Sequence, residues 1–447
     1  MAQKILIVGG VGGGATVAAQ IRRNNQDAVI MLFEKGEYVA FSNCGMPYYL
    51  GGTVQDRDQI LFSTEQFAEK YSVNVRTKAE VTAIQRNEKT VTYMADGQEN
   101  TENYDKLILS PGATAIMPSI PGLNKARTFS LHTIPDMDKI AKYMQEQQPK
   151  TAAIVGGGFI GLEMLENLYE QGITCTLIDR SEQVMNPVDS DMAALVHSYI
   201  KEKNINLVLH DGLKKFTNDG RTLHLESGKT VEADLTIMAV GIKPHTQLAS
   251  NANLSIGETG AIKVNHFMQT EDPSIYALGD AVETTDEITG AAKMIALAWP
   301  AHRQAFIIAS HLNNEHIPYQ GTIGSSILRL FDMTIGATGA NRNSLTANGM
   351  SFKETTIETL SNASYFPSAD KLWIKVLFDA KNGQIYGGQV VGYAGADKRL
   401  AILSTAIKGK LTVFDLQELE LAYAPPYSSP KDPVNILGYK AASMLKK

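Results

Sequence analysis

The chain has two cysteines among its 447 residues, and their neighbours suggest different roles. Cys44 lies among small, polar and aromatic residues in the segment 41–49, FSNCGMPYY. A lone thiol there can attack a disulfide and form a mixed disulfide, if a helix N-terminus or a cation lowers its pKa. The alternative is a buried structural thiol, which is the better interpretation for Cys175 inside the apolar run 174–178. No second cysteine stands five positions from Cys44, so a relay between two cysteines is not expected.

Two strand–turn–helix–strand patterns surround clusters of glycine. The apolar run 4–8 leads into a glycine cluster and then into helical spacing over 15–23. The run 152–155 leads into GGGFIG at 156–161 and a helix predicted over 162–171. Each pattern ends in a second predicted strand, 28–33 or 174–178, followed by an acid, Glu34 or Asp179. In the first cluster Gly9 and Gly14 take the outer positions, and the shifted frame Gly10-x-Gly12-x-x-Ala15 also fits.

This spacing is typical of dinucleotide binding. A pyrophosphate binds backbone N–H groups at a helix N-terminus, and glycine is needed because a side chain would hold the phosphates away. A carboxylate about 20 residues farther on accepts hydrogen bonds from the ribose hydroxyls. One glycine cluster after a strand is often only a tight turn. Two complete copies favour two nucleotide sites, one for FAD and one for a nicotinamide cofactor.

Other predicted strand ends carry residues that suit a nucleotide. They are Ser110-Pro111-Gly112, Gly241 and Gly279-Asp280. An aspartate there can accept a hydrogen bond from a ribityl or ribose hydroxyl, although Gly-Asp is also an ordinary turn signal. The predicted FAD contacts are Gly9, Gly12, Gly14, Glu34, Ser110, Gly112, Gly279 and Asp280. The predicted NAD(P)H contacts are Gly156, Gly158, Phe159, Ile160, Gly161, Asp179, Arg180 and Gly241.

Composition excludes several classes of protein. Lys and Arg number 41 against 47 for Asp and Glu, a net charge of −6, so no basic surplus indicates a nucleic-acid partner. No apolar run reaches 18 residues, so no membrane span is predicted, and the run 4–8 fits a buried strand better than a signal peptide. Two cysteines cannot form a disulfide framework, which favours a reducing, cytoplasmic location. No metal site is predicted.

The pattern changes near residue 322. Antiparallel strands are predicted over 327–330, 350–359, 372–379 and 384–391, helices over 396–408 and 413–418, and an irregular proline-rich segment over 423–432. The predicted fold is α/β, with two Rossmann-like dinucleotide-binding domains and a C-terminal α+β domain. The expected ranges are 1–149 with 245–321 for FAD, 150–244 for NAD(P)H and 322–447 for the C-terminal domain.

Three strings give the chain a specific resemblance to a known family. They are Asn43-Cys44-x-x-Pro47-Tyr48, the segment 297–303 (LAWPAHR) and the segment 422–432 (AYAPPYSSPKD). With the glycine units, Ser110-Pro111-Gly112 and Gly279-Asp280, they resemble the single-cysteine branch of the pyridine nucleotide–disulfide oxidoreductases. The likeness covers essentially the whole chain and is nearest to the coenzyme A-disulfide reductases. NADH oxidases and peroxidases belong to the same branch.

The resemblance implies an FAD enzyme that uses NADH or NADPH and cycles Cys44 between a thiolate and a mixed disulfide with coenzyme A. It implies a homodimer in which the C-terminal domain is the dimerisation domain and completes the partner's active site. Tyr365 and Tyr423 would then lie near the partner's Cys44, where a tyrosine hydroxyl can protonate a leaving thiolate; interface packing is the alternative. The implied coenzyme A contacts are Thr16, Gln20, Arg23, Asn43, His302 and Lys431, and the implied further flavin contacts are Lys35, Ala298 and Tyr423.

Four single residues bear on specificity. Asp179 favours NADH because a carboxylate repels a 2′-phosphate, whereas Arg180 keeps NADPH open. Ala40 stands where coenzyme A-disulfide reductases often have serine. Gly12 stands where oxidases and peroxidases carry histidine, which disfavours their chemistry. The predicted substrate is coenzyme A disulfide, and the alternatives are a coenzyme A-persulfide or polysulfide reductase, an NADH oxidase or peroxidase, and a redox-sensing flavoprotein.

Overall fold

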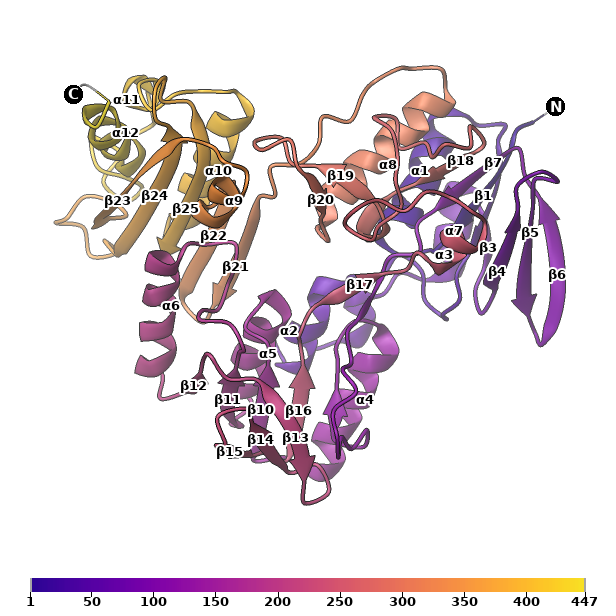
Figure 1. Ribbon diagram of the computed structural model, residues 1–447, viewed down its shortest axis with the longest axis horizontal. Helices are drawn as coiled ribbons and strands as arrows, with labels where there is room; N and C mark the ends of the chain where they lie inside the picture. Colours follow the sequence, from indigo (N-terminus) through magenta and orange to yellow (C-terminus); the bar gives the residue numbers. More distant parts are fainter. Residues whose placement is uncertain (1, 446–447) are drawn as a thin grey trace.

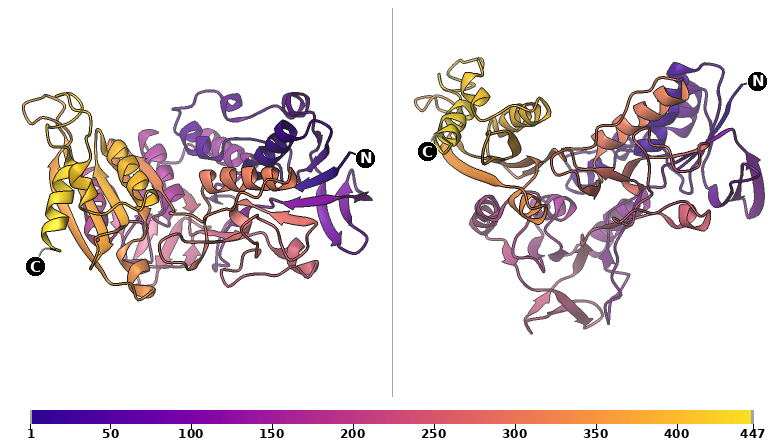
Figure 2. Two further views of the ribbon diagram at one scale, coloured as in Figure 1. Left: turned by 90° about the horizontal axis from the view of Figure 1, so that it is seen from above. Right: turned by 45° about the horizontal axis from the view of Figure 1, so that its top comes forward.

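The computed structural model describes residues 2–445, and Met1 and residues 446–447, which the expected domain ranges include, lie outside it. Three parts, each built on its own sheet, make up the molecule (Figure 1). Figures 1 and 2 show the amino-terminal and C-terminal parts at opposite ends of the long axis. In Figure 1 the second part lies below and between them.

The first part is a five-stranded parallel sheet with helices on one face and a smaller sheet on the other. Its elements are β1 (Lys4–Val8), α1 (Gly12–Asn24), β2 (Val29–Phe33), η1 (Asn43–Gly45), α2 (Met46–Leu50), η2 (Arg57–Ile60), α3 (Thr64–Tyr71), β3 (Asn74–Arg76), β4 (Glu80–Gln85), β5 (Thr90–Ala95), β6 (Gln98–Asn103), β7 (Lys106–Leu109), α7 (Gln247–Asn251), β18 (Ile275–Ala277), η3 (Gly279–Ala281), β19 (Glu283–Thr285), β20 (Ala292–Met294) and α8 (Ala298–Leu312). The strand order is β18-β7-β1-β2-β3. Ile5 and Ile7 of β1 pack in one core with α1 and α8, while Leu6 packs in another with β4 and β5. This alternation makes β1 a buried central strand, as its apolar run predicted.

The second part repeats the parallel arrangement in the order β12-β11-β10-β16-β9. Its elements are β9 (Thr128–Phe129), α4 (Ile134–Gln147), β10 (Thr151–Val155), α5 (Phe159–Glu170), β11 (Thr174–Ile178), α6 (Ser190–Glu202), β12 (Asn206–Val208), β13 (Leu213–Thr217), β14 (Thr222–Leu225), β15 (Thr230–Glu232) and β16 (Leu235–Met238). An antiparallel pair, β8 (Ala113–Ala115) and β17 (Ile242–Pro244), connects the first two parts. The structure groups β9 and α4 with the second sheet, because β9 pairs with β16 and Met137 of α4 shares a core with Ile154 of β10. The sequence had assigned these residues to the range 1–149.

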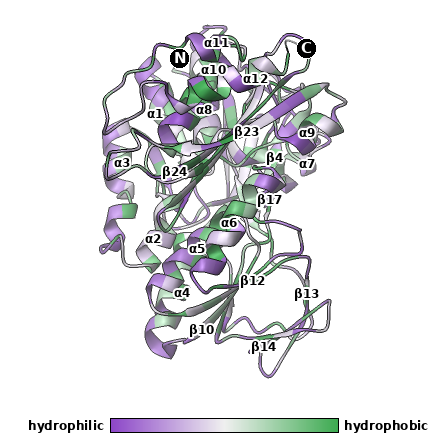
Figure 3. Ribbon diagram, turned by 90° about the vertical axis from the view of Figure 1, so that its left-hand side faces the viewer, coloured by the Kyte–Doolittle hydropathy of each residue, from purple (hydrophilic) through white to green (hydrophobic). Residues whose placement is uncertain are grey.

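The C-terminal part is a five-stranded antiparallel sheet in the order β21-β22-β25-β24-β23. Its elements are β21 (Ser326–Leu330), β22 (Met333–Gly339), α9 (Arg342–Ala347), β23 (Phe352–Leu360), β24 (Lys371–Asp379), β25 (Ile385–Gly392), α10 (Ala396–Lys408), α11 (Asp415–Glu418) and α12 (Pro433–Ser443). Leu403 of α10 and Leu437 of α12 pack with Ile374 and Val390 of the sheet. Figure 3 shows hydrophilic and hydrophobic residues together on the helices α4, α5 and α6, as expected for helices with one buried face.

One apolar core joins the three parts, and a charged cluster around a buried lysine joins the second part to the C-terminal part. The core joins Met46 and Leu50 of α2, the helices and strands of the second part, and Phe331 beside β21. Lys375 of β24 is 0% exposed, and its Nζ lies 2.9 Å from carboxylate oxygens of both Asp189 and Asp191. Breaking a buried ion pair by removing one partner costs about 3–5 kcal/mol, so this cluster fixes α6 against the C-terminal sheet.

The structure confirms the predicted fold class, with two parallel Rossmann-type sheets and an antiparallel C-terminal sheet. Helices α1 and α5 begin three residues before the predicted starts, because residues of the glycine turns already form the first helical turn. The helix predicted over 413–418 spans only Asp415–Glu418, and neither β22 nor α12 was predicted.

Within residues 2–445, no helix is long and apolar enough to cross a bilayer. Over the same residues, no group of His, Cys, Asp and Glu is arranged to hold a metal ion.

Candidate active site

The first glycine turn packs so closely that two positions admit only glycine. Gly9 has a φ of +96°, and a Cβ there would lie 2.0 Å from the carbonyl oxygen of Ser110. A Cβ on Gly14 would lie 1.8 Å from the carbonyl oxygen of Gly9. The chain therefore turns sharply from β1 into α1, and Val11 offers the helix no side-chain cap. The first amides of α1 stay available to an acceptor such as a phosphate oxygen.

A fixed carboxylate and open space lie beside these amides. Glu34 accepts hydrogen bonds from the backbone N–H groups of Gly10 at 2.8 Å and Gly36 at 2.7 Å. A Cβ on Gly12 or Gly112 would meet no atom within 4 Å. Free amides, a held carboxylate and room for phosphates fit a dinucleotide such as FAD. Lys35, next to Glu34, is exposed.

Residues from later in the chain border the same turn. A Cβ on Gly13 would lie 2.8 Å from Ser110 Oγ, so Ser110 lies directly against α1. Gly279 donates its backbone N–H to Oε1 of Gln304 on α8 at 2.8 Å, which fixes η3 against that helix. Burial raises the pKa of Asp280. Ala298 begins α8, which packs against α1 and also lacks a side-chain cap.

The second glycine turn has nearly the same geometry. Gly156 has a φ of +110°, and a Cβ there would lie 2.2 Å from the carbonyl oxygen of Ala239. A Cβ on Gly161 would lie 1.9 Å from the carbonyl oxygen of Gly156, whereas one on Gly158 would meet nothing within 4 Å. Phe159 and Ile160 are the first residues of α5, again without a side-chain cap. The turn therefore fits a second dinucleotide.

The acid of the second unit is held like that of the first. Asp179 accepts hydrogen bonds from the backbone N–H groups of Gly157 at 2.6 Å and Ser181 at 2.7 Å. The neighbouring Arg180 forms an exposed ion pair with Glu226 at 2.7 Å. Gly241, with a φ of +111°, is exposed beyond the end of β16. The predicted cation for a 2′-phosphate is thus paired with a carboxylate of its own chain.

Cys44 lies exposed in η1, directly before α2. Ala40 donates its backbone N–H to the carbonyl oxygen of Gly10 at 2.8 Å, so this segment returns to the first glycine turn. Asn43 donates its Nδ2 to the carbonyl oxygen of His132 at 3.4 Å. A Cβ on Gly45 would lie 2.4 Å from Ile60, which shows how closely η1 packs locally. The thiol is held at the junction of the first glycine turn and α2.

The pKa of Cys44 is raised, so the expectation of a lowered pKa is wrong. Although the residue is exposed, burial around its thiol raises the pKa first, and the charge of Glu163 raises it further. The charge acting on the thiol is therefore that of an acid on α5, where a helix N-terminus or a cation was expected. A raised pKa favours the protonated thiol over the thiolate.

Two acids on α5 are functional candidates that the sequence analysis missed. Burial and the neighbouring Glu166 raise the pKa of Glu163 to about 7. Burial raises the pKa of Glu166 to about 7 as well. Glu166 is 2% exposed, its Oε2 has no hydrogen-bond partner, and its Oε1 lies 3.9 Å from Arg329. Burial and the charges of both acids also raise the pKa of Tyr48 on α2. The available signal was their spacing of three residues, among mostly apolar residues of the helix.

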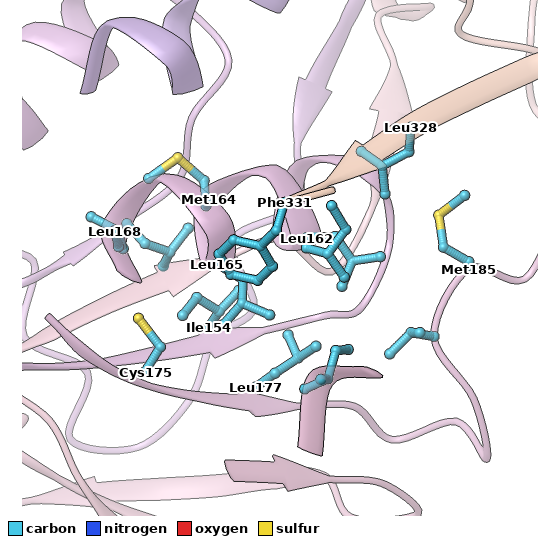
Figure 4. Close-up of a cluster of buried hydrophobic side chains, with 14 of the residues drawn as sticks. Ile154, Leu162, Met164, Leu165, Leu168, Cys175, Leu177, Met185, Leu328 and Phe331 are labelled. Atoms are coloured by element: carbon cyan, nitrogen blue, oxygen red, sulfur yellow. The ribbon is translucent and has the colours of Figure 1, made fainter. Parts of the chain in front are cut away.

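The structure confirms the prediction that Cys175 is a core residue. It is 2% exposed on β11, and Figure 4 shows it among Ile154, Leu168 and other apolar side chains. Burial raises its pKa to about 12. A thiol of this kind stays protonated and out of contact with solvent, so Cys175 offers no redox chemistry.

Most of the predicted coenzyme A contacts gather on α1 and α8. Thr16, Gln20 and Arg23 follow one another on α1 at spacings of four and three residues, which puts them on one face. Thr16 Oγ1 lies 3.5 Å from Nδ1 of His302 on α8. Arg22 donates to backbone carbonyls of residues 71 and 28, whereas Arg23 is exposed, 5.9 Å from the ring centroid of Tyr71. Of the two arginines, Arg23 is therefore the one available to a ligand.

The other predicted contacts lie on the C-terminal part. Tyr365 is 74% exposed and Tyr423 43% exposed, and the hydrogen bond between the two side chains raises the pKa of Tyr423. Lys431 is exposed, with its Nζ 4.7 Å from the ring centroid of Tyr439. Figures 1 and 2 show this part at the far end of the molecule from α1. One chain therefore does not bring these three side chains to its own α1.

Comparison with known proteins gives one consistent family. The model of the pyridine nucleotide-disulphide oxidoreductases matches residues 3–305, and the model of their dimerisation domain matches residues 326–432. A coenzyme A disulfide reductase of Staphylococcus haemolyticus is 37% identical over 447 residues, 99% of this chain and 100% of that protein.

Two solved structures are similarly close over the whole chain. The reduced CoADR-RHD of Bacillus anthracis is 44% identical with a TM-score of 0.98, covering 100% of this chain and 81% of that one. A NAD-dependent persulfide reductase from A. fulgidus is 34% identical with a TM-score of 0.96, covering 98% of this chain and 83% of that one.

Proposed function

The chain belongs to the pyridine nucleotide-disulphide oxidoreductases and is a homologue of the coenzyme A disulfide reductases, and from that premise we propose that it reduces coenzyme A disulfide to coenzyme A with electrons from NADH. The observation that carries this proposal is the exposed thiol of Cys44 in a segment hydrogen-bonded to the first glycine turn. The helix that follows this turn presents Thr16, Gln20 and Arg23. Hydroxyl, amide and guanidinium groups suit the phosphates of coenzyme A.

The first part binds FAD in this proposal. The residues that hold it are Gly9, Gly12, Gly14, Glu34, Lys35, Ser110, Gly112, Gly279, Asp280 and Ala298, with Tyr423 contributed by a partner subunit. The chemistry that FAD supplies when bound is the transfer of an electron pair from a nicotinamide to a disulfide. The domain that holds it comprises 1–149 and 245–321, less β9 and α4, which pack with the second sheet.

The second part, 150–244 with β9 and α4, binds the nicotinamide cofactor. Its proposed contacts are Gly156, Gly158, Phe159, Ile160, Gly161, Asp179, Arg180 and Gly241. NADH is the preferred form because Asp179 repels a 2′-phosphate. The ion pair between Arg180 and Glu226 supports this preference, since a paired guanidinium is less available to that phosphate.

Cys44 carries out the exchange of disulfides. Its thiolate attacks one sulfur of coenzyme A disulfide, so the S–S bond breaks as a Cys44–coenzyme A disulfide forms. The leaving thiolate takes a proton from Tyr423 or Tyr365. The electron pair from NADH then cleaves the mixed disulfide, which restores the Cys44 thiolate and releases a second coenzyme A thiolate that solvent protonates. One NADH and one proton are consumed for each disulfide.

The proposed active enzyme is a homodimer. The dimerisation domain, 322–447, carries Tyr365, Tyr423 and Lys431, and Lys431 with Asn43 and His302 completes the proposed coenzyme A site. The distance between these residues and α1 within one chain supports a site shared between subunits. The proposed location is the reducing cytoplasm, which two unpaired cysteines support.

Mass spectrometry of the protein purified without reductant tests the substrate class. We expect an adduct with the mass of coenzyme A on the peptide that contains Cys44, and NADH oxidation that depends on added coenzyme A disulfide. An unmodified Cys44, together with no NADH oxidation by that disulfide, would overturn the proposal.

A persulfide of coenzyme A is the second candidate substrate, favoured by the likeness to the A. fulgidus persulfide reductase. The same Cys44 would serve, with sulfide as a product. Comparing kcat/KM for coenzyme A disulfide and coenzyme A persulfide separates the two, and a large preference for the persulfide would make it the substrate. Oxygen or peroxide reduction is disfavoured because Gly12 offers no imidazole beside the thiol.

A further inference from the structure

Arg399 on α10 is fully buried, and its guanidinium joins two loops. Nη2 donates to the carbonyl oxygen of Ser361 at 2.9 Å, to Ser428 Oγ at 3.1 Å and to Asp432 Oδ2 at 2.8 Å. Nη1 donates to the carbonyl oxygen of Gly395 at 3.1 Å. One side chain thus connects the residue after β23 with the segment that leads into α12.

The partners of Arg399 are themselves buried and bonded to one another. Ser428 is 0% exposed and Asp432 is 5% exposed, and Ser428 Oγ donates to Asp432 Oδ2 at 2.6 Å. Asp432 also caps α12 by accepting from the backbone N–H of Val434 at 2.9 Å. A buried polar network whose members are all satisfied holds a single arrangement.

The first loop joined to Arg399 carries Tyr365 at its tip. Ser361 closes this loop, because its backbone N–H donates to the carbonyl oxygen of Asp370 at 2.8 Å and its Oγ accepts from the backbone N–H of Asp370 at 3.1 Å. The next residue, Asn362, is 4% exposed and donates its Nδ2 to the carbonyl oxygen of Pro426 at 3.5 Å. The base of the loop is thus rigid and bonded to the second loop, while Tyr365 remains exposed.

The second loop carries Tyr423 before Ser428 and Lys431 after it. The backbone N–H of Ser428 donates to the carbonyl oxygen of Ala424 at 3.1 Å, one residue from Tyr423. Lys398, next to Arg399 on α10, donates to the carbonyl oxygen of Tyr427. Lys431 directly precedes Asp432, the ion-pair partner of Arg399. The two tyrosines proposed to lie near a partner's thiol and the lysine proposed to bind coenzyme A therefore have one common anchor.

We propose that Arg399 is a positioning residue for disulfide reduction: by bonding Ser361, Ser428 and Asp432 it fixes the spacing of Tyr365, Tyr423 and Lys431, and so it acts on the Cys44 of the other subunit. This inference rests on the proposed shared site. Arg399 itself is buried and contacts no substrate. A displacement of about 1 Å in a positioning element costs up to about a hundredfold in rate, so the network matters for turnover even where folding is unaffected.

Ser428→Ala tests the network with a small change, because it removes one hydrogen-bonding hydroxyl and leaves the Arg399–Asp432 ion pair intact. The matched control is Ser404→Ala on α10, the helix that carries Arg399; Ser404 Oγ bonds Ser325 Oγ at 2.9 Å, away from both loops. We expect Ser428→Ala to lower kcat/KM for coenzyme A disulfide about tenfold and to raise KM as Lys431 shifts. Reduction of the bound FAD by NADH stays within about twofold of wild type in both variants. Equal kcat/KM in the two variants would overturn the proposal.

Hybrid dimers show in which subunit the network acts. In the first hybrid, one subunit carries Cys44→Ser and the other Ser428→Ala, so the remaining Cys44 faces unaltered loops. In the second, both changes are in one subunit and the other is wild type, so the remaining Cys44 faces the altered loops. We expect wild-type turnover per remaining Cys44 in the first and about a tenfold loss in the second. The reverse pattern, or equal rates, would refute the assignment.

The inference and the proposed function fail in distinguishable ways. If wild-type protein does not reduce coenzyme A disulfide, the proposed substrate is wrong, and the two hybrids are then compared with whichever disulfide or persulfide the wild type does reduce. Arg399→Lys, which keeps the charge but loses the two-pronged donor, should lower that rate more than Ser428→Ala does. A folded Arg399→Lys dimer with wild-type turnover would contradict the positioning role.

Discussion

The two glycine units share a backbone design and differ in the side chains that they present. In each, the last glycine would place a Cβ within 2 Å of the carbonyl oxygen of the first, at 1.8 Å for Gly14 and 1.9 Å for Gly161. In each, an acid after the second strand accepts a hydrogen bond from the amide of the turn's second glycine, at 2.8 Å for Glu34 and 2.6 Å for Asp179. The backbone thus prepares both units equally for a pyrophosphate.

The helices that follow the two turns diverge at once. Two residues after the last glycine, α1 has Thr16 and α5 has Glu163; nine residues after it, α1 has Arg23 and α5 has Glu170. The first helix offers a hydroxyl and a cation, which suit phosphates, while the second offers acids. Each unit also has one cysteine nearby, exposed after the first and buried in the second. In the proposed enzyme, the repeated backbone therefore provides nucleotide binding, and the side chains added to each copy provide the chemistry.

Replacing the two cysteines should give the largest contrast. Cys44→Ser removes the only exposed thiol and should lower coenzyme A disulfide reduction at least about a hundredfold while FAD stays bound, because a hydroxyl does not form a mixed disulfide. Cys175→Ala should leave turnover near wild type and cost about 1 kcal/mol of unfolding free energy through a small cavity. Steady-state kinetics and thermal unfolding measure the two effects, and substantial activity in Cys44→Ser would contradict the mechanism.

Adding a methyl group to either glycine turn should break one nucleotide site at a time. Gly14→Ala forces a Cβ against a backbone carbonyl and should lower the FAD content of the purified protein at least about tenfold. Gly161→Ala meets the same clash in the second unit, so FAD should stay bound while its reduction by NADH slows at least about tenfold. The flavin absorbance and its anaerobic bleaching by NADH report the two losses, and each variant is the control for the other. Loss of FAD from Gly161→Ala would show that the units are not independent.

Glu163→Gln should make Cys44 more reactive by a modest factor. The ionised Glu163 raises the pKa of the thiol, so removing its charge lowers that pKa and increases the thiolate fraction. At pH 8 we expect alkylation of Cys44 about threefold faster than in wild type. Because the pKa of Glu163 is about 7, the carboxyl is increasingly neutral below that pH, and the two rate profiles should converge near pH 6. If the alkylation rates of the two proteins still differ near pH 6, Glu163 acts through packing and not through its charge.

The smallest expected effect concerns the choice of nicotinamide. Glu226→Gln releases Arg180 from an exposed ion pair, and such pairs contribute about 0–1 kcal/mol. The KM for NADPH should fall about two- to threefold, while the KM for NADH stays unchanged. Glu358→Gln, which removes the exposed partner of Lys371 in the C-terminal sheet, is the matched control. An equal fall for both cofactors would exclude a role for Arg180 in recognising the 2′-phosphate.

The repeated units were predictable because their signals are local. Glycines at fixed spacing, apolar runs and terminal acids follow from the backbone geometry of one short segment, and Gly9, Gly156, Glu34 and Asp179 occupy the expected turns and strand ends. The missed strand β22 shows the limit of that approach. Gly336 and Gly339 interrupt its apolar pattern, yet its neighbours β21 and β25 on both sides make it a strand.

Side-chain environments set by distant segments could not be predicted. Glu163 and Glu166 look like solvent-facing acids of a helix, and only the packing of α2 and β21 against α5 buries them. The pKa of Cys44 is raised first by burial around its own thiol and then by the charge of Glu163, so the expected lowering by a helix N-terminus or a cation failed for the same reason. From the sequence alone, Arg399 would be expected to be a surface charge on α10. It is buried because the loops that contain Ser361 and Ser428 fold over it.

The core that α2, α5 and β21 share has a mechanical consequence. Figure 4 shows Leu328 and Phe331, from the C-terminal part, meeting Leu162 and Leu165 of α5. Met46 of α2, two residues after Cys44, belongs to the same apolar cluster. Moving one part away from another would separate this cluster and expose it to water, so we expect the three parts to move as one block. All three parts should therefore unfold together, in a single calorimetric peak. We also expect the nicotinamide cofactor to enter through small local movements, without a wide hinge opening between the parts.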